Sequence, residues 1–251
     1  MYHLMHREIN GKVSGSFLGV GWLILQPFLL LSMYTLVFGV FMKSRWGDQS
    51  EGVTYFAIAL FPGLLVFNLF ADCLNRAPLL VVNNPNYVKK VVFPLELLVV
   101  PVIGGALIQF FLGYVLCVSL VGFTQNNLPL EAILVPIFLI PFVLMIAGFS
   151  WALSSVGLYF RDLGSLVPLI IQVLMFLSPV LYPISNVPVK IRPLLYLNPL
   201  TFMVDAVRGC VLNGEVPSFT AYISYLIVSI LIAYLGFIIF NSLRPGFSDV
   251  V

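Results

Sequence analysis

Long apolar runs separated by short polar segments dominate the sequence. Asp, Glu, Lys and Arg are absent from six stretches of the chain. Each stretch has at least the roughly 20 residues that a helix needs to cross about 30 Å of hydrocarbon. The stretches lie between Lys12 and Lys43, Glu51 and Asp72, Glu96 and Glu131, Glu131 and Arg161, Asp162 and Lys190, and Glu215 and Arg244.

This pattern predicts an all-α polytopic membrane protein. The expected spans cover residues 17–42, 52–71, 97–122, 132–160, 163–181 and 217–243. Two prolines in the first half of the fourth span, Pro136 and Pro141, predict a kink there. No second domain is apparent, so residues 1–251 are expected to form one transmembrane domain.

Composition supports the same fold class. The chain is 61% hydrophobic and 9% charged, whereas an ordinary soluble domain is about 25% charged. A net charge of +2 is too small to indicate a nucleic-acid partner. Three cysteines without a C-x-x-C spacing predict neither a disulfide framework nor a metal site, and no cofactor is expected on this chain.

Residues 1–15 have the pattern of a short amphipathic helix. Met5, Ile9 and Val13 recur at i, i+4 and i+8, and the polar residues fall elsewhere around the helix. Such a helix is expected to lie on the membrane surface before the first span.

The segment 72–96 is a polar interruption between the second and third predicted spans. It carries five charged residues, several prolines and the run Asn83-Asn84-Pro85-Asn86, which together interrupt a membrane helix. We interpret it as a loop outside the lipid that docks another subunit.

Residues 182–215 are too polar to span and too apolar for a free loop. Asn198 can cap a helix with Pro199 at its first position. The helix is expected over 201–212, with Asp205 and Arg208 three apart on one face, and Asn213-Gly214 would end it. Together with the apolar fragment 193–197 it predicts re-entrant helices. If the two charges act as a pair, a charge-swapped double variant should be less defective than either single alanine variant.

The distribution of Lys and Arg predicts the orientation. Seven lie on the side of both termini and five on the other side, so the termini and the 72–96 loop are expected in the cytoplasm and the 182–215 segment outside.

The motifs in the chain favour transport over catalysis. The predicted spans hold no ionisable residue away from their ends, which argues against proton coupling. No G-x-x-x-x-G-K-[ST] motif occurs, so any ATP must be hydrolysed by another chain. A polyprenol-lipid enzyme would have only Asp162 and Asp205 as acidic candidates, and each has an Arg beside it or three residues on.

Short segments along nearly the whole chain resemble the permeases of ABC-2-type polysaccharide exporters of the O-antigen kind. The segments are REI beginning at Arg7, SFLGVGWLILQP at 16–27, YTLVFG at 34–39, NPNYVKKVVFP at 84–94, FRD at 160–162 with SPVLY at 178–182, and YLNPLT at 196–201 with Arg208.

The resemblance implies a homodimeric channel with two copies of a separate ATPase that binds ATP and Mg²⁺. It would move an undecaprenyl-diphosphate-linked polysaccharide across the bacterial inner membrane. The residues implied at the path or gate are Trp22, Tyr34, Phe38, Tyr182, Asn198, Pro199, Asp205 and Arg208. The residues implied in coupling to the ATPase are Arg7, Arg76, Tyr87, Lys89, Lys90 and Arg161.

Three alternatives remain open at this point. A teichoic acid or capsule exporter fits the same pattern. A small-molecule ABC-2 permease and a membrane enzyme acting on polyprenol lipids fit it less well.

Overall fold

The computed structural model describes residues 21–41, 46, 52–89, 93–125 and 128–250, and these residues form helices and turns without a strand. The predicted surface helix at 1–15, including Arg7, lies outside the described residues, as does Lys90.

Among the described residues, four helical segments are long and apolar enough to cross a membrane: Val53–Leu79, Leu95–Gln125, Leu130–Tyr159 and Phe219–Gly246. They confirm four of the six predicted spans and establish a multi-pass membrane protein. The remaining two correspond to shorter apolar helices, Leu25–Phe41 and Leu163–Leu177.

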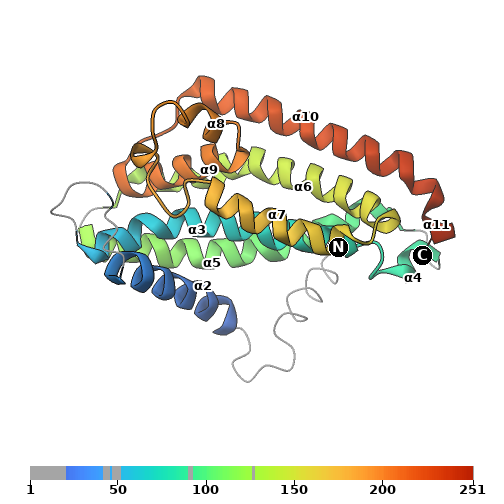
Figure 1. Ribbon diagram of the computed structural model, residues 1–251, viewed down its shortest axis with the longest axis horizontal. Coiled ribbons are helices and arrows are strands. Elements are labelled where there is room, and N and C mark those ends of the chain that lie inside the picture. The colour runs from blue at the N-terminus through green and yellow to red at the C-terminus, as the bar shows by residue number, and fades with distance from the viewer. Residues whose placement is uncertain (1–20, 42–45, 47–51, 90–92, 126–127, 251) are drawn as a thin grey trace.

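The long helices form an elongated bundle with α3 (Val53–Arg76) inside it. Helix α5 (Val99–Gln125) lies alongside α3, and α2 (Gly21–Tyr34) with its π-helical continuation η1 (Thr35–Phe41) packs against both (Figure 1). Helices α6 (Val135–Tyr159) and α7 (Leu163–Leu177) also contact α3. Helix α10 (Phe219–Leu243) packs along α6, and most of its large apolar side chains are exposed, as expected for a lipid-facing helix.

Short helices occupy the two ends of the bundle. Helices α8 (Arg192–Tyr196) and α9 (Pro199–Arg208) lie at one end, and α4 (Pro85–Lys89) and α11 (Phe247–Val250) lie at the other (Figure 1). We call these the gate end and the coupling end, after the roles predicted for the segments 182–215 and 72–96.

Helix α3 continues farther than the sequence predicts. The second span was expected to end at residue 71, but α3 runs to Arg76 and is followed by the 3-10 turn η2 (Ala77–Leu79). The first residues assigned to the 72–96 loop are therefore helical, and Asp72 belongs to a candidate span. Pro78 fits at the start of η2, where its missing N–H breaks no helical hydrogen bond.

Two other predictions, the kink at Pro136 and the helix over 201–212, are corrected. Pro136 lies in the first turn of α6, where proline starts a helix and does not kink it, while Pro141 lies inside α6. The helix expected over 201–212 is found as α9 followed by the π-helical turn η6 (Gly209–Asn213). It ends at Gly214, whose φ of 66° is a left-handed conformation suited to glycine.

Two glycines allow α6 and α10 to pack with their backbones in contact. A Cβ on Gly236 would collide with the backbone of Gly148, and a Cβ on Gly148 would lie 2.6 Å from the Cα of Ala233. Small residues permit such close approach between membrane helices.

Gly148→Val should therefore destabilise the bundle. The added side chain would meet backbone atoms of α10, which cannot move aside as a flexible side chain could. Overpacking of this kind costs about 1–3 kcal/mol, which lowers the melting temperature by several degrees. Thermal unfolding of the detergent-purified protein measures the shift. Gly52→Ala is the matched control, because a Cβ there meets nothing within 4 Å; equal melting temperatures for the two variants would contradict the close-packing account.

Candidate functional site

The gate end is organised by helix α9. The Asn198 side chain caps this helix as predicted, because its Oδ1 accepts a hydrogen bond from the Leu200 N–H at 3.0 Å. Pro199 follows at the first helical position. The Asn198 amide also donates to the Ser178 Oγ at 2.7 Å, so the cap ties α9 to the chain that leaves α7.

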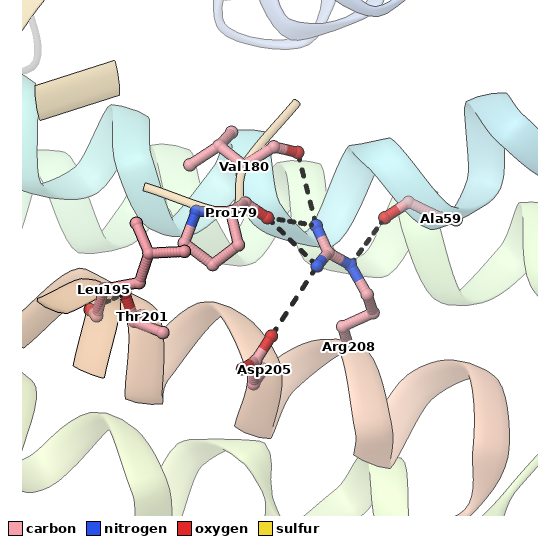
Figure 2. Close-up of polar contacts among 7 residues, drawn as sticks. All are labelled: Ala59, Pro179, Val180, Leu195, Thr201, Asp205 and Arg208. Carbon is pink, nitrogen blue, oxygen red and sulfur yellow. Dashed lines mark hydrogen bonds and ion pairs between the residues drawn. The ribbon is translucent and has the colours of Figure 1, made fainter. Parts of the chain in front are cut away.

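Arg208 joins α9 to two other segments through backbone carbonyl groups (Figure 2). Its Nε donates to the Ala59 carbonyl oxygen of α3 at 2.9 Å. Both Nη1 and Nη2 donate to the Pro179 carbonyl at 3.1 Å, and Nη2 reaches the Val180 carbonyl at 3.3 Å. The planar guanidinium thus supplies donors to a non-helical stretch whose carbonyls have no helical partner.

Asp205 is a secondary partner of this arginine. Its Oδ1 lies 3.8 Å from the Arg208 Nη1, and the aspartate side chain is about a third exposed. The guanidinium is protonated at neutral pH, because arginine does not lose its proton in proteins.

The predicted pair is therefore present, but it is not a simple ion pair. Arg208 also lies over the Trp46 ring, with 4.3 Å from Cζ to the ring centroid. A carboxylate at position 208 offers no donor to the carbonyls that Arg208 serves. A charge-swapped double variant is therefore not expected to be less defective than the Arg208→Ala variant.

Glycine at position 63 makes room for the guanidinium. A Cβ there would lie 2.8 Å from the Arg208 Nη2 and 3.4 Å from the Val180 carbonyl oxygen. Thr201 adds a further link at this end, since its Oγ1 donates to the Leu195 carbonyl at 2.6 Å (Figure 2).

Three of the four predicted path aromatics lie near the gate end. Tyr34 stacks on Phe38 with 6.2 Å between ring centroids, and its hydroxyl donates to the Met175 sulfur of α7 at 3.6 Å. The Tyr182 hydroxyl donates to the Phe176 carbonyl at 3.0 Å. Tyr34 and Tyr182 therefore contact α7 directly, and Phe38 contacts Tyr34.

Trp22, the fourth predicted aromatic, lies apart from them in a polar cavity. This cavity of about 430 Å³ lies between α2, α3 and α5. It is lined by Trp22, Gln26, Pro27, Leu30, Asn68, Ala71, Asp72, Asn75 and Gln109.

Sequence reasoning missed the amide residues of this polar cavity. A count of charged residues overlooks Asn and Gln, so Gln26, Asn68 and Gln109 were treated as part of plain spans. The sequence pattern that could have predicted the cavity is the spacing of Asn68, Asp72 and Asn75 at i, i+4 and i+7, which places them on one helical face.

The coupling end is held by a small hydrophobic cluster. It joins the chain around α4 to α6, α10 and α11 through Val81, Leu95, Leu98, Leu158, Phe240 and Phe247. Tyr87 packs against Phe93 with 5.0 Å between ring centroids. The Glu96 Oε2 accepts from the Arg244 Nη1 at 3.2 Å, and the Trp151 Nε1 donates to the Glu96 carbonyl at 2.9 Å.

The other predicted coupling residues gather at this end without forming one site. Arg76 ends α3, and the α6–α7 turn that contains exposed Arg161 packs beside η2 through Gly157 and Gly164. Lys89 at the end of α4 is exposed. Within the described ranges, no three His, Cys, Asp or Glu side chains gather as a possible metal site.

Replacing Arg208 with Leu should destabilise the gate end strongly, because it leaves buried carbonyls without donors. We expect about 3 kcal/mol, the range for breaking a buried charged contact. Arg208→Lys should be intermediate, since an ammonium group lacks the planar fork. Asp205→Asn is the matched control and should cost less than about 1 kcal/mol.

Denaturant unfolding of the purified variants measures these differences. If Asp205→Asn were as destabilising as Arg208→Leu, the ion pair and not the carbonyl contacts would hold this end together.

Comparison with known proteins agrees with this architecture. The chain is 25% identical to the O-antigen export system permease protein RfbA of Myxococcus xanthus over 251 residues, covering 99% of this chain and 94% of the relative. It is equally similar to a protein of the same name from Klebsiella pneumoniae, with 99% and 93% covered. The polysialic acid transport protein KpsM of Escherichia coli is 24% identical, with 85% and 81% covered. The family model for ABC-2 type transporters matches residues 1–212, and with most of its length matched, the chain belongs to the ABC-2 type transporter family.

Proposed function

We propose that this chain is the permease subunit of an ATP-driven exporter that moves a lipid-linked polysaccharide of the O-antigen type outward across the bacterial inner membrane. The observation that carries the proposal is the similarity to O-antigen export permeases over 99% of the chain. Two copies of the chain would form the channel, and two copies of a separate ATPase would bind ATP and Mg²⁺.

The need for a second subunit is supported by the sequence. The full chain contains no phosphate-binding loop of the G-x-x-x-x-G-K-[ST] type, and without one it lacks the backbone cradle that such ATPases use for the phosphates. Transport against a gradient then requires hydrolysis on a partner.

In this proposal the chain crosses the membrane six times. The four long spans are joined by two shorter ones, α2–η1 and α7. Helix α7 has 15 residues, or about 22 Å at 1.5 Å per residue, which is less than the hydrocarbon thickness. The chain would complete the crossing through the irregular residues that follow α7. Helices α8 and α9 would be re-entrant, and both termini would be cytoplasmic.

The gate and the coupling surface are assigned to opposite ends. Tyr34, Phe38, Tyr182 and the Asn198–Arg208 network would form the outward gate. The exposed Lys89 and Arg161 and the end of α3 at Arg76 would face the ATPase, together with Tyr87, Arg7 and Lys90. Exposed positive charge is suited to fast association with a partner of complementary charge.

Export of a capsular polymer is the second candidate, and the similarity to a polysialic acid transport protein favours it. That similarity covers 85% of the chain, against 99% for the O-antigen export permeases, so we rank it below O-antigen export.

The proposal is tested by co-expressing the chain with an ABC-type ATPase subunit from the native host. We expect a stable complex whose ATP hydrolysis changes when lipid-linked polysaccharide extracted from that host is added. A permease that purifies without any ATPase, or a complex indifferent to the lipid, would contradict the proposal.

A charge reversal in the same complex tests the assigned coupling end. Lys89→Glu should weaken co-purification of the ATPase at moderate salt, because a docking charge is reversed. Lys190→Glu, an equally exposed lysine near α8, is the matched control and should leave the complex intact. Equal losses in both variants would remove the coupling role from α4.

A further inference from the structure

The polar cavity is unusual for its position among apolar helices. Three helices contribute to it: α2 with Trp22 and Gln26, α3 with Asn68, Asp72 and Asn75, and α5 with Gln109. Its volume of about 430 Å³ lies in the range of small-molecule sites. A second, smaller cavity shares Pro27, Asn68, Asp72 and Gln109 with it and reaches in toward Phe110 of α5.

Polar groups at such a position require hydrogen-bonding partners. Hydrocarbon supplies none, and an unsatisfied polar group there is costly. Among the described residues, the buried Oδ1 of Asn75 has no hydrogen-bond partner. Buried amide oxygens of this kind are normally satisfied by protein, water or ligand, so Asn75, which lines the cavity, has an acceptor that no described protein group satisfies.

The chemistry of the lining indicates the class of that ligand. Each amide of Gln26, Asn68, Asn75 and Gln109 offers both donors and an acceptor, and the Asp72 carboxylate is an acceptor. The indole of Trp22 is 41% exposed and provides a flat apolar face. A sugar ring matches these groups, because its adjacent hydroxyl groups both donate and accept hydrogen bonds and one of its faces is apolar.

The charged groups in the cavity lining favour a sugar over a phosphate as the ligand. Among the described residues that line the cavity, Asp72 is the charged one and none is Lys or Arg, whereas sites for phosphate groups normally supply cationic side chains. A diphosphate group is therefore disfavoured here, whereas an uncharged sugar is not.

We propose that the polar cavity between α2, α3 and α5 binds a neutral sugar residue of the transported glycolipid, and that it does so near the coupling end of the bundle. This proposal rests on the proposed export function and adds a recognition site to it. The sugar would exchange hydrogen bonds with Gln26 and Asn68 and lie against the Trp22 ring.

The test uses the complete permease–ATPase complex in lipid nanodiscs. Two probes are titrated: lipid-linked polysaccharide from the native host, and polyprenyl diphosphate that carries no sugar. The readout is the concentration of each probe that gives half-maximal stimulation of ATP hydrolysis. The double variant Gln26→Leu with Asn68→Leu removes two amides from different helices, and leucine is well tolerated in membrane helices.

For the double variant we expect the half-maximal concentration of the polysaccharide lipid to rise on the order of tenfold, the effect of losing two neutral hydrogen bonds. The response to the sugar-free lipid should stay unchanged. Asn241→Leu is the matched control, because this exposed amide lies on α10, which packs on α6 and not on α2, and it does not line the cavity. Ala71→Phe fills the cavity without removing an amide and should reproduce the shift.

The remaining outcomes distinguish a failure of the export function from a failure of the sugar site. If the wild-type complex ignores the polysaccharide lipid, the export function fails and the sugar site fails with it. If the wild-type complex responds and the variants match it, or if the variants lose response to both lipids equally, the export function stands and the sugar site is overturned. In those cases the polar cavity holds water, another part of the protein or the diphosphate.

Discussion

The arrangement of the gate end depends on one guanidinium that satisfies backbone carbonyls where the chain is not helical. In a membrane protein, irregular backbone is tolerated only where the protein itself supplies hydrogen-bonding partners. Arg208 does this for Pro179 and Val180 and adds the Ala59 carbonyl of α3. Glycine at position 63 leaves the space that the guanidinium occupies. The same contacts that permit the break after α7 therefore fix α9 against the central helix.

Helix α3 connects this network with the coupling end. Its 24 residues extend about 36 Å. Ala59, which contacts Arg208, is about 26 Å along the helix from Arg76 beside the α6–α7 turn. The polar face of Asn68, Asp72 and Asn75 lies between these two points. A rigid, mostly buried helix that touches the gate, the polar cavity and the coupling end offers a physical route by which events at one end affect the other.

Much of the fold was predictable because charge is costly in hydrocarbon, so charge-free runs mark membrane spans. The Asn198–Pro199 cap and the Asn213-Gly214 stop were also predictable, since both depend on local backbone chemistry. The end of α3 was not, because Asp72 lines a polar cavity that α3 forms together with α2 and α5. Likewise, the carbonyl partners of Arg208 and the Glu96–Arg244 contact, which joins residues 148 positions apart, arise from tertiary packing that no local pattern records.

Polymer movement itself is the most direct test of the export account. The permease and its ATPase would be reconstituted together in liposomes, and lipid-linked polysaccharide would be added on the ATPase side. The account predicts ATP-dependent appearance of the polymer inside the liposomes, where added glycosidase cannot reach it, and no such protection when either subunit is omitted. Protection without the ATPase, or none with both subunits and ATP present, would contradict it.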